Sequence, residues 1–319
     1  MPKFKVLITD YAWPNLEIEQ RTLREVDAEL IVADKQDAES LTRLAAEADA
    51  IMTNWAKVPA AVINGAPRCK LVARLGIGLD NIDVAAATAK GMLVTNIPDY
   101  CLIEVAEHAL ALLLSMGRKV AFYHHETMAG RYDLKAGAVL RRIEGQTLGI
   151  VGLGNIGSAL ARKATALGLK VVATSRSRRP APANVVYCSL DELLAQSDYV
   201  SLHVPMTPDT KHLIGEKQFS QMKPTAYLIN TARGGLIDHA ALAKALDAGQ
   251  LAGAALDVQD PEPPNLSERP WSDPRVLVTP HAAFVSEESL NDLRSRTARQ
   301  VVECLSGREP KHVVNRPAT

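Results

Sequence analysis

Three side chains with complementary chemistry follow three apolar runs in the C-terminal half of the chain. They are Arg233, Glu262 and His281, and each run before them is typical of a buried strand. A guanidinium can bind a carboxylate and polarise a carbonyl group, and an imidazole can donate or accept a proton near neutral pH. A lone histidine after a strand is more often a satisfied polar residue, so the prediction depends on the ordered series. Downstream of a glycine-rich loop, the series indicates a redox enzyme.

The glycine-rich loop is Val151–Gly157. The apolar run Thr147–Val151 precedes it and the helical pattern Ser158–Leu167 follows, so strand, turn and helix come in the order that a dinucleotide site requires. Glycines let backbone amides approach a pyrophosphate, and the helix N-terminus adds partial positive charge. A merely structural turn is the alternative. We predict that the cofactor-binding residues of this loop are Gly152, Gly154, Asn155, Ile156 and Gly157.

The end of the next apolar run, Lys170–Thr174, indicates which dinucleotide binds. An acidic residue that would bind the ribose hydroxyls of NAD is expected there, but the chain continues with Ser175 and Arg176, followed by Arg178 and Arg179. A hydroxyl and a guanidinium can bind a 2′-phosphate, which a carboxylate would repel. A basic loop that is only solvated is the alternative. We predict that Ser175 and Arg176 bind the cofactor and that NADP is preferred, with NAD possible.

Size and composition limit the other possibilities. With 319 residues and 47% hydrophobic content, the chain can bury a large core and form two domains. Its 36 basic residues balance 36 acidic ones, which favours a small-molecule partner over nucleic acid or a membrane surface. The 4 cysteines are dispersed and the N-terminus lacks a signal-peptide core, so we expect reduced thiols and a cytoplasmic location. We expect no metal site, because no ligand set converges on the unassigned histidines His108, His124, His125 and His212.

Short apolar runs alternate with amphipathic stretches along the chain, which predicts parallel sheets. The first series of expected strands is Lys5–Ile8, Glu29–Ala33, Ala50–Thr53, Leu71–Arg74 and Met92–Thr95. The second series, after the glycine loop, is Lys170–Thr174, Tyr199–Val204, Ala226–Asn230, Ala252–Leu256 and Arg275–Thr279. We predict an α/β fold with two doubly wound, Rossmann-like domains and a cleft between them.

Two helical patterns indicate how the domains are joined. Val105–Met116 is apolar nearly all round, which predicts a buried helix between the two series of strands. Glu287–Leu305 is amphipathic and ends near Gly307, a typical helix stop, and we expect it to return the chain to the first domain. The predicted domains are residues 1–100 with 286–319 for substrate binding, and residues 101–285 for dinucleotide binding.

Taken together, the motifs resemble the D-isomer-specific 2-hydroxyacid dehydrogenase family from about Lys5 to about Gly307. The matching segments are Arg74–Asp83, Val151–Gly157, His203–Pro205 with Thr210, Thr231–Gly234, Leu256–Val258, Glu262–Pro263 and Pro280–His281. Such a set is far more specific than any single motif. The resemblance implies an oxidoreductase that reduces a small 2-oxo acid to the D-2-hydroxy acid by hydride transfer from NAD(P)H.

The resemblance also implies a role for each matching residue. His281 would be the general acid in reduction and the base in oxidation, with Glu262 orienting the ring and favouring its protonated form. Arg233 would bind the substrate and polarise its carbonyl group. Backbone amides of the loop Leu75, Gly76, Ile77 and Gly78 would bind the substrate carboxylate. Further cofactor-binding residues would be Val204, Pro205, Thr210, Thr231, Ala232, Arg233, Asp257 and His281, with Asp257 at the nicotinamide carboxamide.

Several branches of the family remain open at this point. The segment Thr174–Arg179 is most similar to NADP-linked glyoxylate and hydroxypyruvate reductases, so we expect a small 2-oxo acid, with Asn54, Trp55 and Phe284 setting its size. Residues 281–287 are also similar to the C-terminal-binding-protein branch, in which a dehydrogenase fold serves as a transcriptional corepressor. A nucleotide-sensing protein with little turnover is therefore the alternative function.

Two other relatives fit the sequence less well. Formate oxidation does not require the proton transfer for which a Glu262 and His281 pair is suited. Phosphoglycerate dehydrogenases usually carry an additional regulatory domain, which we do not expect here because the chain ends at Thr319. The family commonly pairs through the cofactor domain, so we expect a homodimer that uses about Gly117–Ile143.

Overall fold

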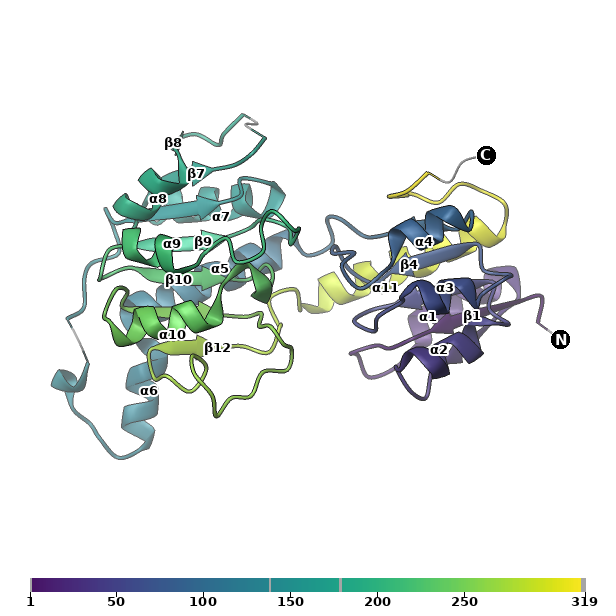
Figure 1. Cartoon of the computed structure of the whole chain (residues 1–319), viewed down its shortest axis with the longest axis horizontal. Helices are drawn as coiled ribbons and strands as arrows, with labels where there is room; N and C mark the ends of the chain where they lie inside the picture. The colour runs from purple at the N-terminus through teal and green to yellow at the C-terminus, as the bar shows by residue number, and fades with distance from the viewer. Residues whose placement is uncertain (1, 138, 178–179, 317–319) are drawn as a thin grey trace. The chain divides into compact units, whose positions relative to one another are not determined.

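The computed structural model describes residues 2–137, 139–177 and 180–316 of the chain (Figure 1). The chain forms two compact units: unit 1 comprises Met1–Tyr100 and Ser286–Thr319, and unit 2 comprises Cys101–Val285. Each unit contains one sheet of parallel strands with helices on both faces, which confirms the α/β fold with two doubly wound units. The substrate-binding and dinucleotide-binding roles of the units stay predictions.

Unit 1 has a five-stranded sheet in the order β2-β1-β3-β4-β5. Its strands are β1 (Phe4–Ile8), β2 (Ala28–Val32), β3 (Ala50–Thr53), β4 (Leu71–Arg74) and β5 (Leu93–Thr95). Its helices are α1 (Glu17–Leu23), η1 (Arg24–Val26), α2 (Ala38–Ala45), α3 (Ala60–Asn64), α4 (Val84–Ala89) and α11 (Glu287–Leu305). Helices α1 and α11 pack on one face, and α2, α3 and α4 on the other. The central strands are continuous apolar runs because both of their faces are buried.

Unit 2 has a seven-stranded sheet in the order β12-β11-β10-β9-β6-β7-β8. Its strands are β6 (Thr147–Val151), β7 (Lys170–Thr174), β8 (Val185–Tyr187), β9 (Tyr199–Leu202), β10 (Tyr227–Asn230), β11 (Gly253–Leu256) and β12 (Val276–Val278). Its helices are α5 (Leu102–Arg118), α6 (Val120–Met128), η2 (Leu134–Ala136), α7 (Asn155–Ala166), α8 (Leu190–Gln196), α9 (Glu216–Gln221), η3 (Gly234–Leu236) and α10 (His239–Asp247). Helices α5 and α7 cover one face, and α8, α9 and α10 cover the other.

Because the strands of unit 2 are parallel, the loops that carry its predicted site residues all leave the carboxyl ends of the strands, on the same side of the sheet. From β6 the chain winds outward through β7 and β8, then returns to β9 beside β6 and winds the other way to β12. Ligands of open α/β sheets bind outside the carboxyl ends of the strands at such a switch point. The loops after β10, β11 and β12 also leave this edge side by side, because these strands are parallel neighbours.

Two features of unit 2 differ from the sequence prediction. The edge strand β8 was not predicted, because it has only 3 residues and follows a basic, proline-containing stretch. The stretch Val105–Met116, predicted to be a buried helix, lies within α5 but is not buried all round: Ala106, Ala109 and Leu113 belong to the core, whereas Ala111 is exposed. None of the helices that the described residues form is both long and apolar enough to cross a membrane.

Candidate active site at the strand ends of unit 2

The three glycines after β6 meet different steric demands. Gly152 has a φ of +100°, and a Cβ there would lie 2.5 Å from the carbonyl oxygen of His203. A Cβ on Gly157 would lie 2.2 Å from the carbonyl oxygen of Gly152, so only glycine lets α7 pack this closely on the turn. Gly154, at the N-cap of α7, has no described atom within 4 Å of its Cβ position. Two glycines therefore shape the turn, and Gly154 leaves room for a phosphate at the helix N-terminus.

Ser175 and Arg176 follow β7, the neighbour of β6 in the sheet. Ser175 is half-buried, and Arg176 is exposed without an ion pair or hydrogen bond to any part of the chain that the structure describes. The side chain of Arg176 is therefore available for a ligand anion. Arg178 and Arg179, which belong to the same predicted basic segment, lie outside the described residues.

The segment after β9 lies on the other side of the glycine loop. Thr210 Oγ1 donates to the carbonyl oxygen of Pro205 at 2.8 Å and accepts from the backbone N–H of Thr207 at 2.8 Å. Thr210 thus stabilises the turn that follows Val204 and Pro205, and its contact with a cofactor stays a prediction. Burial lowers the pKa of His203, in contact with Ser201 Oγ at 2.9 Å, to about 4. His203 is therefore neutral at pH 7 and supplies no cation to the site.

The loop after β10 carries Arg233 in a fixed backbone conformation. Asn230 is fully buried, and its Nδ2 donates to the carbonyl oxygen of Arg233 at 2.8 Å while its Oδ1 accepts from the N–H of Ala232 at 3.0 Å. A Cβ on Gly234 would lie 2.0 Å from the carbonyl carbon of Gln259. The loop that carries Arg233 therefore packs directly against the loop that follows β11.

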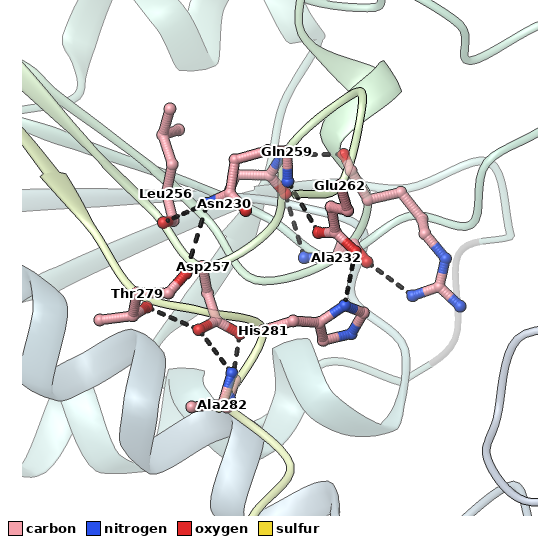
Figure 2. A network of polar contacts seen from close by, with 11 residues as sticks. Asn230, Ala232, Leu256, Asp257, Gln259, Glu262, Thr279, His281 and Ala282 are labelled. Atoms are coloured by element: carbon pink, nitrogen blue, oxygen red, sulfur yellow. Dashed lines mark hydrogen bonds and ion pairs between the residues drawn. The ribbon is translucent and has the colours of Figure 1, made fainter. Parts of the chain in front are cut away.

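Hydrogen bonds connect the loop after β11 to the imidazole of His281 (Figure 2). Glu262 accepts from the N–H of Gln259 through Oε1 at 2.8 Å and from Nδ1 of His281 through Oε2 at 3.0 Å. Gln259 Nε2 in turn donates to the carbonyl oxygens of Leu256 at 3.0 Å and Thr279 at 3.3 Å. Because Nδ1 is held by the carboxylate, Nε2 is the nitrogen that proton transfer to a substrate would use. The structure thus brings the predicted Glu262 and His281 together.

Asp257 lies beneath the turn that carries His281 rather than on the surface of the site. Its side chain is 0% exposed, and it accepts from the N–H groups of Ala282 at 2.9 Å and Ala283 at 3.0 Å and from Thr279 Oγ1 at 2.6 Å. Burial alone would raise the pKa of Asp257, but the nearby imidazole of His108 and the hydrogen bonds from these groups lower it to about 2. The carboxylate is therefore ionised, and it holds the backbone of the turn that carries His281. Its predicted contact with the nicotinamide carboxamide stays a prediction.

The predicted carboxylate-binding loop belongs to unit 1 and follows β4. The N–H of Leu75 donates to the carbonyl oxygen of Thr53 at 2.8 Å, so it continues the strand ladder and is not available to a substrate. A contact of Leu75 with the substrate through other atoms stays a prediction. The N–H groups of Gly76, Ile77 and Gly78 have no acceptor among the described residues, and they stay the predicted donors.

Buried polar groups beneath this loop fix its course. The side chain of Arg74 donates from Nε to Asn81 Oδ1 at 3.1 Å and also contacts the carbonyl oxygen of Leu75. Asn54 is only 2% exposed and its Oδ1 accepts from Nη1 of Arg74 at 3.4 Å, whereas its neighbour Trp55 is 45% exposed. Of the side chains expected to set substrate size, Phe284 lies in unit 2, with its ring edge-on to His281 at a centroid distance of 6.0 Å.

Two observations show that the strand ends of unit 2 fit a nicotinamide dinucleotide. The open space at Gly154 can accept a pyrophosphate at the start of α7. The hydroxyl of Thr231, after β10, is buried without a hydrogen-bond partner among the described residues. A buried hydroxyl without a partner is unfavourable, and a polar ligand would satisfy it. The residues present therefore fit a dinucleotide with its pyrophosphate at Gly154 and a polar group of the ligand near the loop that carries Arg233.

Comparisons with known proteins agree with this geometry. Residues 110–283 match the model of the family described as "D-isomer specific 2-hydroxyacid dehydrogenase, NAD binding domain". A glyoxylate reductase of Thermococcus litoralis is 37% identical over 289 residues, which cover 85% of this chain and 84% of that protein. A D-3-phosphoglycerate dehydrogenase of Methanocaldococcus jannaschii is 37% identical over 320 residues, which cover 98% of this chain and 60% of that protein.

Solved structures of similar proteins contain both kinds of nicotinamide cofactor. An acyclic imino acid reductase in complex with NADPH and D-Arg superposes with a TM-score of 0.87 at 27% identity, covering 98% of this chain and 100% of that one. A D-lactate dehydrogenase of Aquifex aeolicus in complex with NAD and lactic acid gives a TM-score of 0.86 at 30% identity and the same coverage. The chain therefore belongs to the D-isomer specific 2-hydroxyacid dehydrogenase family and is an NAD(P)-dependent enzyme of that family.

Proposed function

We propose that the protein reduces a small 2-oxo acid to the D-2-hydroxy acid with NADPH, and that His281 is the general acid. The observation that carries this proposal is the 3.0 Å contact between His281 Nδ1 and Glu262, on loops next to the one that carries Arg233. A carboxylate, an imidazole and a guanidinium on adjacent strand ends supply what carbonyl reduction needs besides the hydride: a proton and a stabilising cation.

Each residue has one task in this proposal. Bound reduced nicotinamide supplies the hydride that the C2 carbonyl carbon accepts. Arg233 donates to the carbonyl oxygen and stabilises the negative charge that develops there. His281 transfers the proton on Nε2 to that oxygen, so one hydride and one proton complete the hydroxy acid. Glu262 holds Nδ1 throughout, which leaves the proton transfer to Nε2.

The size of the substrate is proposed from the relatives and from the ring of Phe284. A glyoxylate reductase is among the similar proteins, and Phe284 is 8% exposed and packs on His281, which favours a substrate with a small group at C2. Glyoxylate and hydroxypyruvate meet this condition. A D-3-phosphoglycerate dehydrogenase has the same 37% identity, so a phosphorylated hydroxy acid is the second substrate class to compare.

The first test is a panel of substrates with each cofactor. NADPH and NADH oxidation is followed at 340 nm with glyoxylate, hydroxypyruvate, pyruvate and a phenyl-substituted 2-oxo acid, and NADP⁺ and NAD⁺ reduction with D-3-phosphoglycerate. We expect the highest kcat/KM for NADPH with glyoxylate or hydroxypyruvate. Tight nucleotide binding without turnover of any substrate would contradict the proposal and favour a nucleotide-sensing protein.

The proposed preference for NADP is supported by the residues after β7. The half-buried Ser175 offers a hydroxyl at the strand end where an acidic residue would exclude a 2′-phosphate. Next to it, the exposed Arg176 has no carboxylate partner among the described residues, so its charge is not already neutralised. A guanidinium binds phosphate through paired N–H donors. NADPH offers its 2′-phosphate to these donors, whereas NADH has only a hydroxyl group at that position.

Arg176→Ala is expected to raise the Kd of NADPH by about 10- to 100-fold, because a hydrogen bond between charged groups contributes about 1.5–3 kcal/mol. The Kd of NADH should change by less than about threefold in the same variant, which makes NADH the internal control. Ser175→Asp should reverse the preference, since a carboxylate repels the 2′-phosphate. Both dissociation constants can be measured by fluorescence titration. Equal losses for the two nucleotides would show that Arg176 does not bind the phosphate.

We also propose a homodimer that uses the predicted segment of about Gly117–Ile143, which contains α6. Helix α6 has no buried residue in the isolated chain, and Met128 is 74%, Tyr132 93% and Leu134 85% exposed. A helix in water is stabilised mainly by packing, so α6 needs a partner surface. Figure 1 shows α6 extending beyond the layers of unit 2. A second copy is the occupant that we propose, because the family resemblance places pairing in this segment.

The double substitution Tyr132→Asp and Leu134→Asp is expected to shift the protein from dimer to monomer at micromolar concentration. Two charges in an apolar contact are strongly unfavourable, whereas both positions are exposed in the monomer and tolerate aspartate there. Light scattering after gel filtration measures the mass. Leu266→Asp, at a residue of unit 2 that is 61% exposed and outside the segment, is the matched control and should remain dimeric. A wild-type monomer would overturn the proposal.

A further inference from the structure

The backbone of His281 lies in a sparsely populated region of conformational space. Its φ is +52°, in the left-handed region that only a few per cent of non-glycine residues adopt. Such a conformation persists only where the surrounding structure imposes it. The direction of the His281 side chain, and with it the position of Nε2, therefore depends on the groups that hold the turn Pro280–Ala283.

Asp257 supplies most of these groups. Its carbonyl oxygen accepts from the N–H of His281 at 2.8 Å, and its two carboxylate oxygens accept from the N–H groups of Ala282 at 2.9 Å and Ala283 at 3.0 Å. Three successive N–H groups of the turn thus converge on one residue at the end of β11. A rotation of the Asp257 side chain would release two of them, so the conformation of the turn depends on what holds that carboxylate.

Thr279 and His108 hold the carboxylate from the other side. Thr279 Oγ1 donates to Asp257 Oδ1 at 2.6 Å, and His108 Nε2 lies 3.1 Å from Thr279 Oγ1 and 3.4 Å from Asp257 Oδ1. An ionised carboxylate can only accept, so the single hydroxyl proton of Thr279 is directed to Asp257. The hydroxyl oxygen must then accept from His108, which requires a proton on Nε2 of His108. The order of donation is therefore His108 to Thr279 to Asp257.

His108 reaches this position from a different layer of the fold. It lies on α5, which packs against β10 and β11, whereas Thr279 follows β12. Neither residue is part of the Glu262 and His281 pair, and the side chain of His108 is 24% exposed while that of Asp257 is 0% exposed. A buried network of polar side chains is stable only if each of its groups has a hydrogen-bond partner. In this network His108, Thr279 and Asp257 each have one.

We propose that His108 and Thr279 are positioning residues for proton transfer by His281. They fix the carboxylate of Asp257, which fixes the left-handed turn and keeps Nδ1 of His281 on Glu262. This inference rests on the proposed role of His281 as the general acid, and it adds two residues that touch neither substrate nor cofactor in the mechanism. If the network served only to fill the core, its loss would lower stability without a selective loss of kcat.

Matched pairs of variants test the proposal. Thr279→Val keeps the shape and removes the hydroxyl, whereas Thr279→Ser keeps the hydroxyl. His108→Leu removes the donor, whereas His108→Gln retains an N–H donor near the position of Nε2. We expect Thr279→Val and His108→Leu to lower kcat by about 10- to 100-fold, the size seen when groups that orient a reacting ligand are removed. Thr279→Ser and His108→Gln should recover most of that loss.

The remaining readouts separate positioning from other roles. The Kd of NADPH and the KM of the 2-oxo acid should stay within about threefold of wild type, and the double variant Thr279→Val with His108→Leu should lose no more than the worse single variant, because both act through one chain. Parallel losses of kcat and NADPH affinity would instead assign the network to cofactor binding. Equal kcat in Thr279→Val and Thr279→Ser would overturn the proposal.

A measurement without turnover keeps this test separate from that of the proposed function. The imidazole signals of His281 in ¹⁵N-histidine spectra, assigned with His281→Asn, should move in Thr279→Val and return in Thr279→Ser. If the wild-type protein reduces no 2-oxo acid, the proposed function fails, and the spectra still decide whether the network positions His281. Unchanged His281 signals in Thr279→Val would overturn the positioning role whether or not the enzyme is active.

Discussion

Replacing His281 with asparagine is expected to lower kcat for 2-oxo acid reduction by about 10²- to 10⁴-fold, the usual contribution of a general acid or base. Asparagine is a better replacement than alanine, because asparagine tolerates the left-handed φ of +52° at this position and does not add backbone strain. It also has no group that can transfer a proton near pH 7. Initial rates at saturating NADPH measure kcat, and fluorescence titration measures the Kd of the nucleotide.

The nucleotide provides the control within this experiment. The Kd of NADPH should change little in His281→Asn, because the phosphates and the 2′-phosphate are assigned to Gly154 and Arg176. His312→Asn, at an exposed histidine of unit 1 whose φ of +57° is close to that of His281, should leave kcat unchanged and exclude a general effect of removing a histidine. A kcat of His281→Asn within about threefold of wild type would remove His281 from its role.

Arg233→Ala is expected to lower kcat/KM by about 10³-fold or more. One donor to a developing oxyanion contributes about 10²- to 10³-fold to kcat, and Arg233 is also the proposed cation for the substrate. Arg233→Lys keeps the charge but not the planar pair of donors, so it should recover only part of the loss. The backbone of the loop should survive both changes, because Asn230 binds the carbonyl oxygen of Arg233 and the N–H of Ala232, and both of these contacts remain in the variants.

The separate effects on KM and kcat show what Arg233 does. Ground-state binding alone would raise KM with kcat unchanged, whereas stabilisation of the transition state lowers kcat. We expect both parameters to change. If Arg233→Lys kept the full wild-type kcat/KM, the planar pair of N–H donors of Arg233 would not be needed. An unchanged kcat in Arg233→Ala would exclude a role of Arg233 in polarising the carbonyl group.

Most strands could be predicted from the sequence because the central strands of both sheets are buried on both faces. Such strands are continuous apolar runs, and the expected Ala50–Thr53, Leu71–Arg74 and Lys170–Thr174 coincide with β3, β4 and β7. The last helix, expected at Glu287–Leu305, has the bounds of α11 because Ser286 caps its start and Gly307, with a φ of +76°, follows its end. Local chemistry defines these elements, so a single sequence suffices.

The features that were missed depend on contacts between distant segments. Nothing near His108 in the sequence points to Thr279 or Asp257, which meet it only because α5 packs on β10 and β11. The loss of the Leu75 amide to the strand ladder likewise requires its partner Thr53, 22 residues earlier in the chain. The 3-residue β8 is too short to produce a periodic signal. Sequence patterns thus predicted the contact between Glu262 and His281, but not the groups that hold the turn around His281.

The most direct test of the central claim follows the hydride itself. The protein is incubated with NADPH that carries deuterium at the transferable position of C4 and with hydroxypyruvate or pyruvate, whose reduction creates a stereocentre at C2. Mass spectrometry and chiral chromatography then analyse the product. We predict a D-2-hydroxy acid with one deuterium at C2, formed at a rate that His281→Asn lowers by about 10²-fold or more. An L-configured product, a product without deuterium, or no product despite bound NADPH would contradict the proposed reaction.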